Sequence, residues 1–287
     1  MSTDILERYN KDGYVIMKNI IPISRINAVL ESVFKQYCKY SDNEEDFESF
    51  DKPWNTKLFH QKLISFRKSN PELFGAIYDT LKTNLALMNL VSDDNVTNCV
   101  SKLFGMKLSD FSVSDQMVRL DVPEDARNIH GWHQERSFFP QNRSGLNGLV
   151  CWVPLNKATK ENGAIHICVG SHKEGLLSTK REGKRDGSYT TQISVPEDYV
   201  KKYEDIMVET NVGDAVFFNM LLFHRSGKNI SNELRFTIQS RYHMSTADDF
   251  IPYEFINYYN PFVKQKLLEN NFDCSDIPDN KRQPPVV

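Results

Sequence analysis

The spacing of apolar positions changes near residue 110, and the two parts of the chain predict different structures. Before that point, one apolar set recurs at the three- and four-residue intervals of a helix face: Ile26, Val29, Leu30, Val33 and Phe34. Ser24 stands where it can cap that helix, and Pro71 is placed to begin a second one that continues through Tyr78 to Leu85. Residues 1–109 are therefore predicted to be mostly helical and to support the rest of the chain.

After residue 110, the chain is a series of short apolar runs rich in Val, Ile, Phe and Trp, as strands are. These runs occupy residues 112–122, 148–155, 163–169, 214–224 and 234–244. No amphipathic helix pattern separates them, which favours antiparallel pairing. Residues 110–250 are predicted to form an antiparallel barrel or a double-sheet jelly roll, covered on one side by the N-terminal helices.

Composition narrows the class of protein. A β-rich chain of 287 residues often forms one unit, so we expect a single domain over residues 1–287. The net charge of −3 provides no general positive field, so we expect neither nucleic acid nor a membrane as a partner. The chain shows no signal-peptide pattern, and its five cysteines are widely spaced, as in a reducing compartment. We expect a cytoplasmic protein, and no pattern indicates an oligomeric state.

A charged segment between Ser171 and Gly213 is too polar to belong to a core. It is either a solvated surface loop or a lid, because long loops between strands commonly cover a binding site. The lid would span about residues 174–206 and would be mobile without ligand, since the segment offers few apolar anchors. The end of the chain, residues 276–287, is expected to be a loose tail.

The densest chemistry is the segment HGWHQE, residues 130–135. On a strand, His133 and Glu135 would share one face about 6.5 Å apart. His224 ends a later apolar run, and two imidazoles with one carboxylate leave positions open on an ion, which suits iron(II) oxygen chemistry. Spacing alone leaves two other interpretations: ordinary strand histidines, or a zinc-dependent hydrolase that uses His130, His133 and Glu135.

Four segments resemble the phytanoyl-CoA dioxygenase family of iron(II)- and 2-oxoglutarate-dependent oxygenases: residues 9–21, 132–135, 151–175 and 212–242. The resemblance implies a mainly β chain with N-terminal helices, folded as a double-stranded β-helix (jelly roll, cupin-like). It also implies Fe(II), 2-oxoglutarate as cosubstrate and O2, with oxidation of a small molecule and release of succinate and CO2. The remaining alternative is a non-catalytic metal-containing binding or sensing domain of the same fold.

By position, the resemblance makes His133, Glu135 and His224 the iron ligands. The family usually has His-x-Asp, so Glu135 is a departure, although its extra methylene still allows it to reach a metal. Arg235 matches the arginine that pairs with the distal carboxylate of 2-oxoglutarate, a role that suits a planar guanidinium. Ser226 matches a hydroxyl that supports the same carboxylate.

Further pocket residues follow less directly. Gln116 and Trp152 are candidates for the lining of the cosubstrate pocket. Alternation along residues 234–244 puts Arg241 on the same strand face as Arg235, so Arg241 either contacts the substrate or pairs with an acid such as Asp214. Arg136 follows the metal motif and is either a substrate contact near the pocket mouth or a solvated surface charge. Inward arginines favour a polar or anionic small molecule over a fatty acyl chain.

Overall fold

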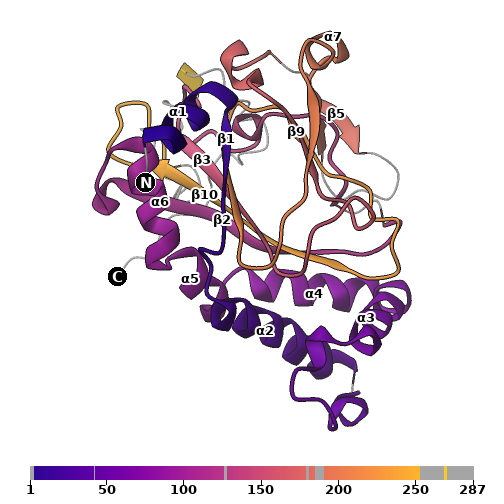
Figure 1. Ribbon diagram of the computed structural model, residues 1–287. Coiled ribbons are helices and arrows are strands. Elements are labelled where there is room, and N and C mark those ends of the chain that lie inside the picture. Colours follow the sequence, from indigo (N-terminus) through magenta and orange to yellow (C-terminus); the bar gives the residue numbers. More distant parts are fainter. Residues whose placement is uncertain are drawn as a thin grey trace, which may run out of the picture.

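The computed structural model describes residues 3–41, 43–125, 128–178, 181–184, 191–252 and 268–269. Figure 1 shows a layer of helices along one side of a β structure, with the helices coming from the N-terminal part of the chain. The predicted tail at residues 276–287 lies outside the described residues, as do residues 179–180 and 185–190 of the predicted lid.

The N-terminal part contains six α-helices and one strand among its described residues: α1 (Thr3–Asp12), β1 (Tyr14–Met17), α2 (Ile23–Ser41), α3 (Lys57–Ser69), α4 (Pro71–Leu81), α5 (Leu85–Val91) and α6 (Asp94–Phe104). α2 buries the predicted apolar face, but it begins before Ser24, which is therefore not its cap. Pro71 begins α4 as predicted. The helix does not continue to Leu85, because the side chain of Asn84 accepts from the Ala86 amide at 2.8 Å and begins α5 instead.

Two antiparallel sheets follow. The major sheet has the order β1-β8-β3-β10-β2 and the minor sheet the order β7-β4-β9. Their remaining strands are β2 (Phe111–Asp121), β3 (Gly148–Pro154), β4 (Ile165–Cys168), β7 (Asp205–Val208), β8 (Ala215–Asn219), β9 (His224–Arg225) and β10 (Arg235–Met244). A small hairpin, β5 (Arg181–Lys184) with β6 (Thr191–Ile193), and the short helix α7 (Glu197–Val200) lie in the charged segment.

The run at residues 214–224, predicted as one strand, is divided between the two sheets. β8 ends at Asn219, whose side-chain oxygen accepts from the Leu221 amide at 2.9 Å and whose carbonyl accepts from Leu222 at 3.0 Å. An asparagine that bonds the backbone two residues later makes a turn. The chain therefore leaves the major sheet and enters the minor sheet at His224, which places that histidine opposite the major sheet.

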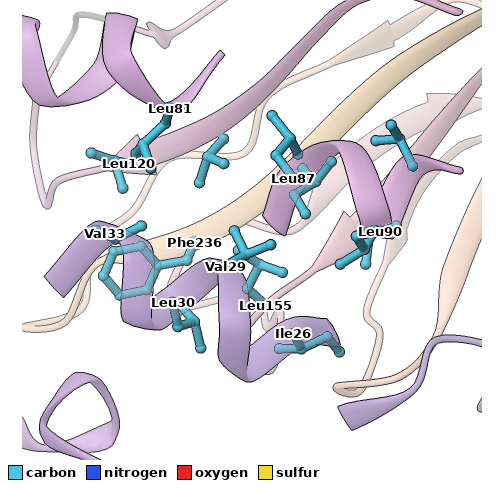
Figure 2. Packing of buried hydrophobic residues seen from close by; sticks show 14 of the residues in the cluster. Ile26, Val29, Leu30, Val33, Leu81, Leu87, Leu90, Leu120, Leu155 and Phe236 are labelled. Carbon is cyan, nitrogen blue, oxygen red and sulfur yellow. The ribbon is translucent and has the colours of Figure 1, made fainter. Parts of the chain in front are cut away.

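The major sheet is buried on both faces. Alternation along each strand determines which of the two cores a side chain enters. Along β3, Leu149, Cys151 and Val153 belong to the core shared with the helices, whereas Val150 and Trp152 belong to the core between the sheets. Figure 2 shows α2 side chains packed near Phe236 of β10 in the first of these cores. The helical share of the chain is larger than a mainly β description implies. In the described residues, no helix has both the length and the apolar character to cross a membrane.

Phe59 of α3 connects the helices to the sheet, so its truncation is expected to be costly. Its ring is fully buried, stacks on Phe236 at a centroid distance of 6.3 Å and contacts Tyr37 edge-on. Phe59→Ala should lower the free energy of unfolding by about 3–5 kcal/mol, measured by urea denaturation. Phe50→Ala, at a ring that is 42% exposed, is the matched control and should cost far less. Equal losses in the two variants would contradict this packing.

Candidate metal centre

His133 and His224 are held next to each other by their own backbones. The His133 amide donates to the His224 carbonyl at 3.0 Å, and the His224 amide donates back at 3.1 Å. The two imidazole centroids are consequently 4.1 Å apart. A pair of reciprocal backbone bonds fixes both Cα positions, so the two rings enter the cavity from a rigid base.

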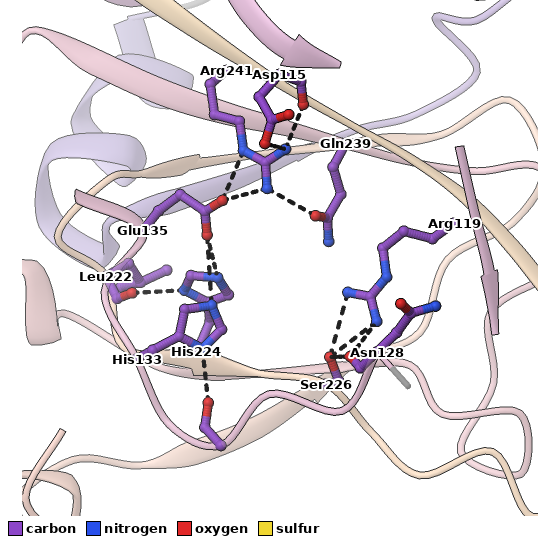
Figure 3. A network of polar contacts seen from close by, with 11 residues as sticks. Asp115, Arg119, Asn128, His133, Glu135, Leu222, His224, Ser226, Gln239 and Arg241 are labelled. Atoms are coloured by element: carbon purple, nitrogen blue, oxygen red, sulfur yellow. Dashed lines mark hydrogen bonds and ion pairs between the residues drawn. The ribbon is translucent and has the colours of Figure 1, made fainter. Parts of the chain in front are cut away.

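Glu135 completes the group. The sequence analysis considered it on a strand with His133, but the structure does not place it on a strand. It opens the single 3-10 turn η5 (Glu135–Ser137). Its Oε2 lies 3.0 Å from His224 Nε2 and 3.6 Å from His133 Nε2. One ligand atom from each of the three buried residues lies within 4.8 Å of the others, a geometry that can hold a metal ion. Figure 3 shows the three side chains converging on one space.

Hydrogen bonds to the backbone determine which nitrogen of each ring faces the shared space. His133 Nδ1 lies 2.7 Å from the Gly131 carbonyl, and His224 Nδ1 lies 2.9 Å from the Leu222 carbonyl. A carbonyl only accepts, so each Nδ1 carries a hydrogen, and each Nε2 is the ring nitrogen that faces the shared space and can bind a metal. Burial and the neighbouring His224 lower the pKa of His133, which keeps its ring neutral. Two imidazoles beside a carboxylate suit iron(II).

Arg241 of β10 lies behind the carboxylate. Its Nε donates to Glu135 Oε1 at 2.7 Å, and its Nη2 donates to the same oxygen. Burial by itself would raise the pKa of Glu135, but the Arg241 charge and then the adjoining rings of His133 and His224 hold that pKa well below its usual value. Glu135 is therefore a carboxylate at neutral pH.

Arg119 lies across the site from the histidines (Figure 3) and belongs to a second charged group. Arg119 of β2 donates to Asp121 Oδ1 at 3.0 Å, and Arg235 of β10 donates to Asp121 Oδ2 at 2.5 Å. Two guanidiniums share one carboxylate, so this Arg119–Asp121–Arg235 cluster carries one excess positive charge. All three residues are buried. Such a cluster is suited to an anionic ligand.

The two arginines of the cluster occupy different places. Arg119 and Ser226 line the cavity that contains the histidines, with Arg119 Nη1 3.4 Å from Ser226 Oγ. Arg235 instead lines an adjoining cavity of about 410 Å³. Gly227 allows Ser226 this position, because a Cβ at residue 227 would lie 2.3 Å from the Ala164 carbonyl oxygen. The family match pointed to Arg235, and the alternation of β2 was the signal that could have identified Arg119.

The metal-side cavity has a volume of about 440 Å³. Its lining combines the polar groups above with aromatic and aliphatic side chains: Phe138, Phe139, Trp152, Ile165 and Phe218. Ile193, at the end of β6, also lines it, so part of the charged segment covers the cavity. Asp115, Asn128 and Arg225 belong to the lining as well, and the sequence analysis did not single them out.

Other predicted pocket residues lie in varied places. Trp152 is in the lining, and its buried Nε1 has no hydrogen-bond partner among the described residues. Gln116 points the other way, toward the helices, where its Nε2 contacts the Lys82 carbonyl at 3.3 Å. Arg136 is buried outside the cavity, and its Nε donates to the Arg143 carbonyl at 3.0 Å. Neither Gln116 nor Arg136 is placed to touch a molecule in this cavity.

His130 was the competing metal ligand, in a zinc site with His133 and Glu135. Its ring lines the cavity at a centroid distance of 5.2 Å from His133. Burial, and then the proximity of His133, lowers its pKa to about 3. Among the described residues, the group with metal-binding geometry contains His224 and not His130. The structure thus favours the iron-type set over the zinc set.

Known proteins resemble this chain in sequence and in fold. A family model described as phytanoyl-CoA dioxygenase (PhyH) matches residues 9–237. A probable phytanoyl-CoA dioxygenase of Caenorhabditis elegans is 26% identical over 241 residues, 82% of this chain and 72% of that protein. The peroxisomal phytanoyl-CoA dioxygenase of Homo sapiens is 23% identical over 246 residues, 84% of this chain and 67% of that protein.

A solved structure gives the corresponding result for the fold. The epimerase SnoN in complex with Fe3+, alpha ketoglutarate and nogalamycin RO superposes with a TM-score of 0.58 at 19% identity, covering 85% of this chain and 83% of the other. Together with the two antiparallel sheets, this likeness confirms the predicted double-stranded β-helix fold.

The Arg119–Asp121–Arg235 cluster should make stability depend on pH. Burial alone would raise the pKa of Asp121, but Arg119 and Arg235 lower it to about 2, below its unfolded value of about 3.9. Asp121→Asn should therefore cost about 3–5 kcal/mol of unfolding free energy at pH 7, and the difference from wild type should shrink as the pH falls from about 4 toward 2.

Urea denaturation at several pH values measures this difference. Asp46→Asn is the control, because Asp46 forms an exposed ion pair with Lys62 and should contribute under about 1 kcal/mol. A pH-independent loss in Asp121→Asn would show that the carboxylate charge does not stabilise the cluster.

Proposed function

The chain belongs to the phytanoyl-CoA dioxygenase family of iron(II)- and 2-oxoglutarate-dependent oxygenases, and from that premise we propose that His133, Glu135 and His224 ligate its iron. The observation that carries the proposal is the convergence of these three buried side chains on one cavity. The enzyme would oxidise a small molecule that binds in this cavity.

The cosubstrate would lie between the metal centre and the Arg119–Asp121–Arg235 cluster. Arg119 is the cation of that cluster in the metal-side lining, and its buried Nε has no hydrogen-bond partner among the described residues. Trp152 Nε1 is a second such donor in the same lining. Buried donors of this kind are costly unless a ligand satisfies them, and a dicarboxylate supplies the acceptors. The residues present therefore fit 2-oxoglutarate.

In this arrangement, Arg119 takes over the contact with 2-oxoglutarate that was predicted for Arg235. Its guanidinium bonds Asp121, so we propose that it acts by holding that carboxylate while Arg119 and Ser226 contact the distal carboxylate of 2-oxoglutarate. Arg235 Nη1 is also buried without a partner among the described residues.

Bound iron and 2-oxoglutarate supply the oxygen chemistry, and the protein supplies position and shielding. The aromatic side chains of Phe138, Phe218 and Trp152 in the lining exclude water from the metal face. Ile193 extends this cover from the charged segment, which supports the interpretation of that segment as a lid. The proposed reaction is hydroxylation or a related oxidation.

We propose that the substrate is polar, although the arginines that suggested an anionic substrate have other partners or positions. Arg241 is committed to Glu135, and Arg136 lies outside the cavity, so neither provides a site for an anion. Lys82 and Arg225, the other cations of the cavity lining besides Arg119, each pair with a carboxylate. A small molecule with both polar and apolar parts matches this balanced lining better than a strongly anionic one.

The metal assignment is tested by removing one ligand. His224→Ala should lose stoichiometric Fe(II) binding and iron-dependent formation of succinate from 2-oxoglutarate, because the two remaining ligands leave the ion weakly held. Metal titration under anaerobic conditions and succinate detection by mass spectrometry, with a panel of candidate substrates, measure the two effects. His172→Ala is the control, since that imidazole contacts the Asn10 carbonyl and not the cavity. Retention of both properties in His224→Ala would refute the assignment.

The cosubstrate assignment predicts different effects for two arginines of the same lining. Arg119→Leu should weaken 2-oxoglutarate binding about 100-fold, or about 2.7 kcal/mol, because a buried carboxylate loses its cation. Arg119→Lys should recover only part of that affinity. Arg225→Leu should change it little, since the Arg225 charge is already paired with Asp205. Calorimetric titration of the metal-loaded variants decides the question, and an unchanged affinity in Arg119→Leu would assign the anion to another cation.

A further inference from the structure

The two oxygens of Glu135 have different partners. Oε1 accepts two N–H groups from Arg241, whereas Oε2 faces the Nε2 atoms of His133 and His224. One oxygen is thus occupied by a guanidinium, and the other is directed at the space where the ligand atoms meet. The two oxygens of the carboxylate therefore have separate roles.

Arg241 has further contacts that fix the position of its guanidinium. Its Nη1 donates to the Asp115 carbonyl at 2.7 Å, and its Nη2 donates to Gln239 Oε1 at 2.9 Å. Its guanidinium lies 4.3 Å from the centroid of the Phe139 ring, on which a planar cation stacks well. The side chain is 4% exposed. A guanidinium fixed in this way has a single position from which to hold Glu135.

The backbone creates one of these contacts at a bulge. The pairing of β10 with β2 shifts register between Gln239 and Arg241, and Asp115 of β2 has φ of 41° in the left-handed region. A bulge puts an extra residue on one strand and redirects its carbonyl. Left-handed backbone at a residue other than glycine is uncommon and costs energy, and such positions cluster at functional sites. The bulge brings the Asp115 carbonyl to Arg241.

We propose that Arg241 is a positioning residue that restricts Glu135 to one metal-binding oxygen, and that this division is why the ligand is a glutamate. The inference rests on the proposed iron site. An aspartate is shorter by one methylene, about 1.5 Å, and would not reach both the guanidinium and the metal. Chelation by both oxygens would occupy a second position on the ion, and open positions are what this ligand type provides.

A double-mutant cycle on Co(II) affinity tests the proposal without requiring a substrate. Arg241→Met should weaken Co(II) binding about 10–100-fold, the usual cost of losing a group that orients a ligand. In the background of Glu135→Asp, whose carboxylate no longer spans both partners, Arg241→Met should change the affinity by less than about threefold. The visible spectrum of bound Co(II) should differ between wild type and Arg241→Met, because a second carboxylate oxygen can then bind.

Several outcomes would overturn the proposal. Equal losses in both backgrounds would mean that Arg241 serves the scaffold alone. Tighter Co(II) binding by Arg241→Met would mean that the charge of Arg241 matters and its positioning does not. Arg241→Lys keeps the charge but not the planar fork, so it should weaken binding in the wild-type background and not in the Glu135→Asp background. If Arg241→Met does not fold, the comparison of Arg241→Lys in the two backgrounds provides the test.

Two controls separate this inference from the proposed function. Arg67→Met removes another largely buried arginine, paired with Asp125 at 2.7 Å, and should leave Co(II) affinity unchanged. If wild type binds no Co(II), or His133→Ala binds it equally well, the iron site itself is wrong. If wild type binds Co(II) through His133 and Arg241→Met binds it with the same affinity, only the role of Arg241 is wrong.

Discussion

The reciprocal backbone hydrogen bonds between His133 and His224 are the contact on which the rest of the site depends. They join the segment after β2 to the edge of the minor sheet, and they set the separation of two rings from distant parts of the chain. Because the Nδ1 atoms are bonded to nearby carbonyls, the same local structure also orients the rings and selects their tautomer. Glu135 needs only a single helical turn to join them.

A second constraint is the balance of buried charge on the cavity face of the major sheet. Alternation along β10 sends Phe236 and Ile238 to the helix side and sends Arg235 and Arg241 to the other side. Buried guanidiniums are costly without partners, and each of these two has a carboxylate. The pair at the metal end is neutral, whereas the cluster at the far end keeps one positive charge. A dicarboxylate that enters the cavity is thereby directed toward Arg119.

Local patterns predicted much of this structure. The apolar face of α2, the apolar runs of the strands and the inward row on β10 all follow from periodicity, which depends on backbone geometry alone. The candidate ligands could be identified because their spacing and the family resemblance agreed. The helix break at Asn84 and the turn at Asn219 were missed, since each depends on one side chain that bonds the backbone in competition with a regular element.

The remaining errors have tertiary causes. Nothing local to Arg235 shows that Asp121 is its neighbour, because that pairing depends on β2 lying beside β10. Gln116 and Arg119 are an odd number of residues apart, so one strand cannot present both to the same cavity; Arg119 lines it, and Gln116 faces the helices. The partner of Arg241 required knowledge of the turn that carries Glu135. Charge near the motif therefore did not show that Arg136 lies outside the cavity.

The most direct test of the account is anomalous diffraction from crystals grown without oxygen in the presence of Mn(II) and 2-oxoglutarate. The account predicts one metal per chain, bound by Nε2 of His133, Nε2 of His224 and the single oxygen Oε2 of Glu135, with the distal carboxylate of 2-oxoglutarate against Arg119. A metal held by His130 in place of His224, or no metal among these residues, would contradict it.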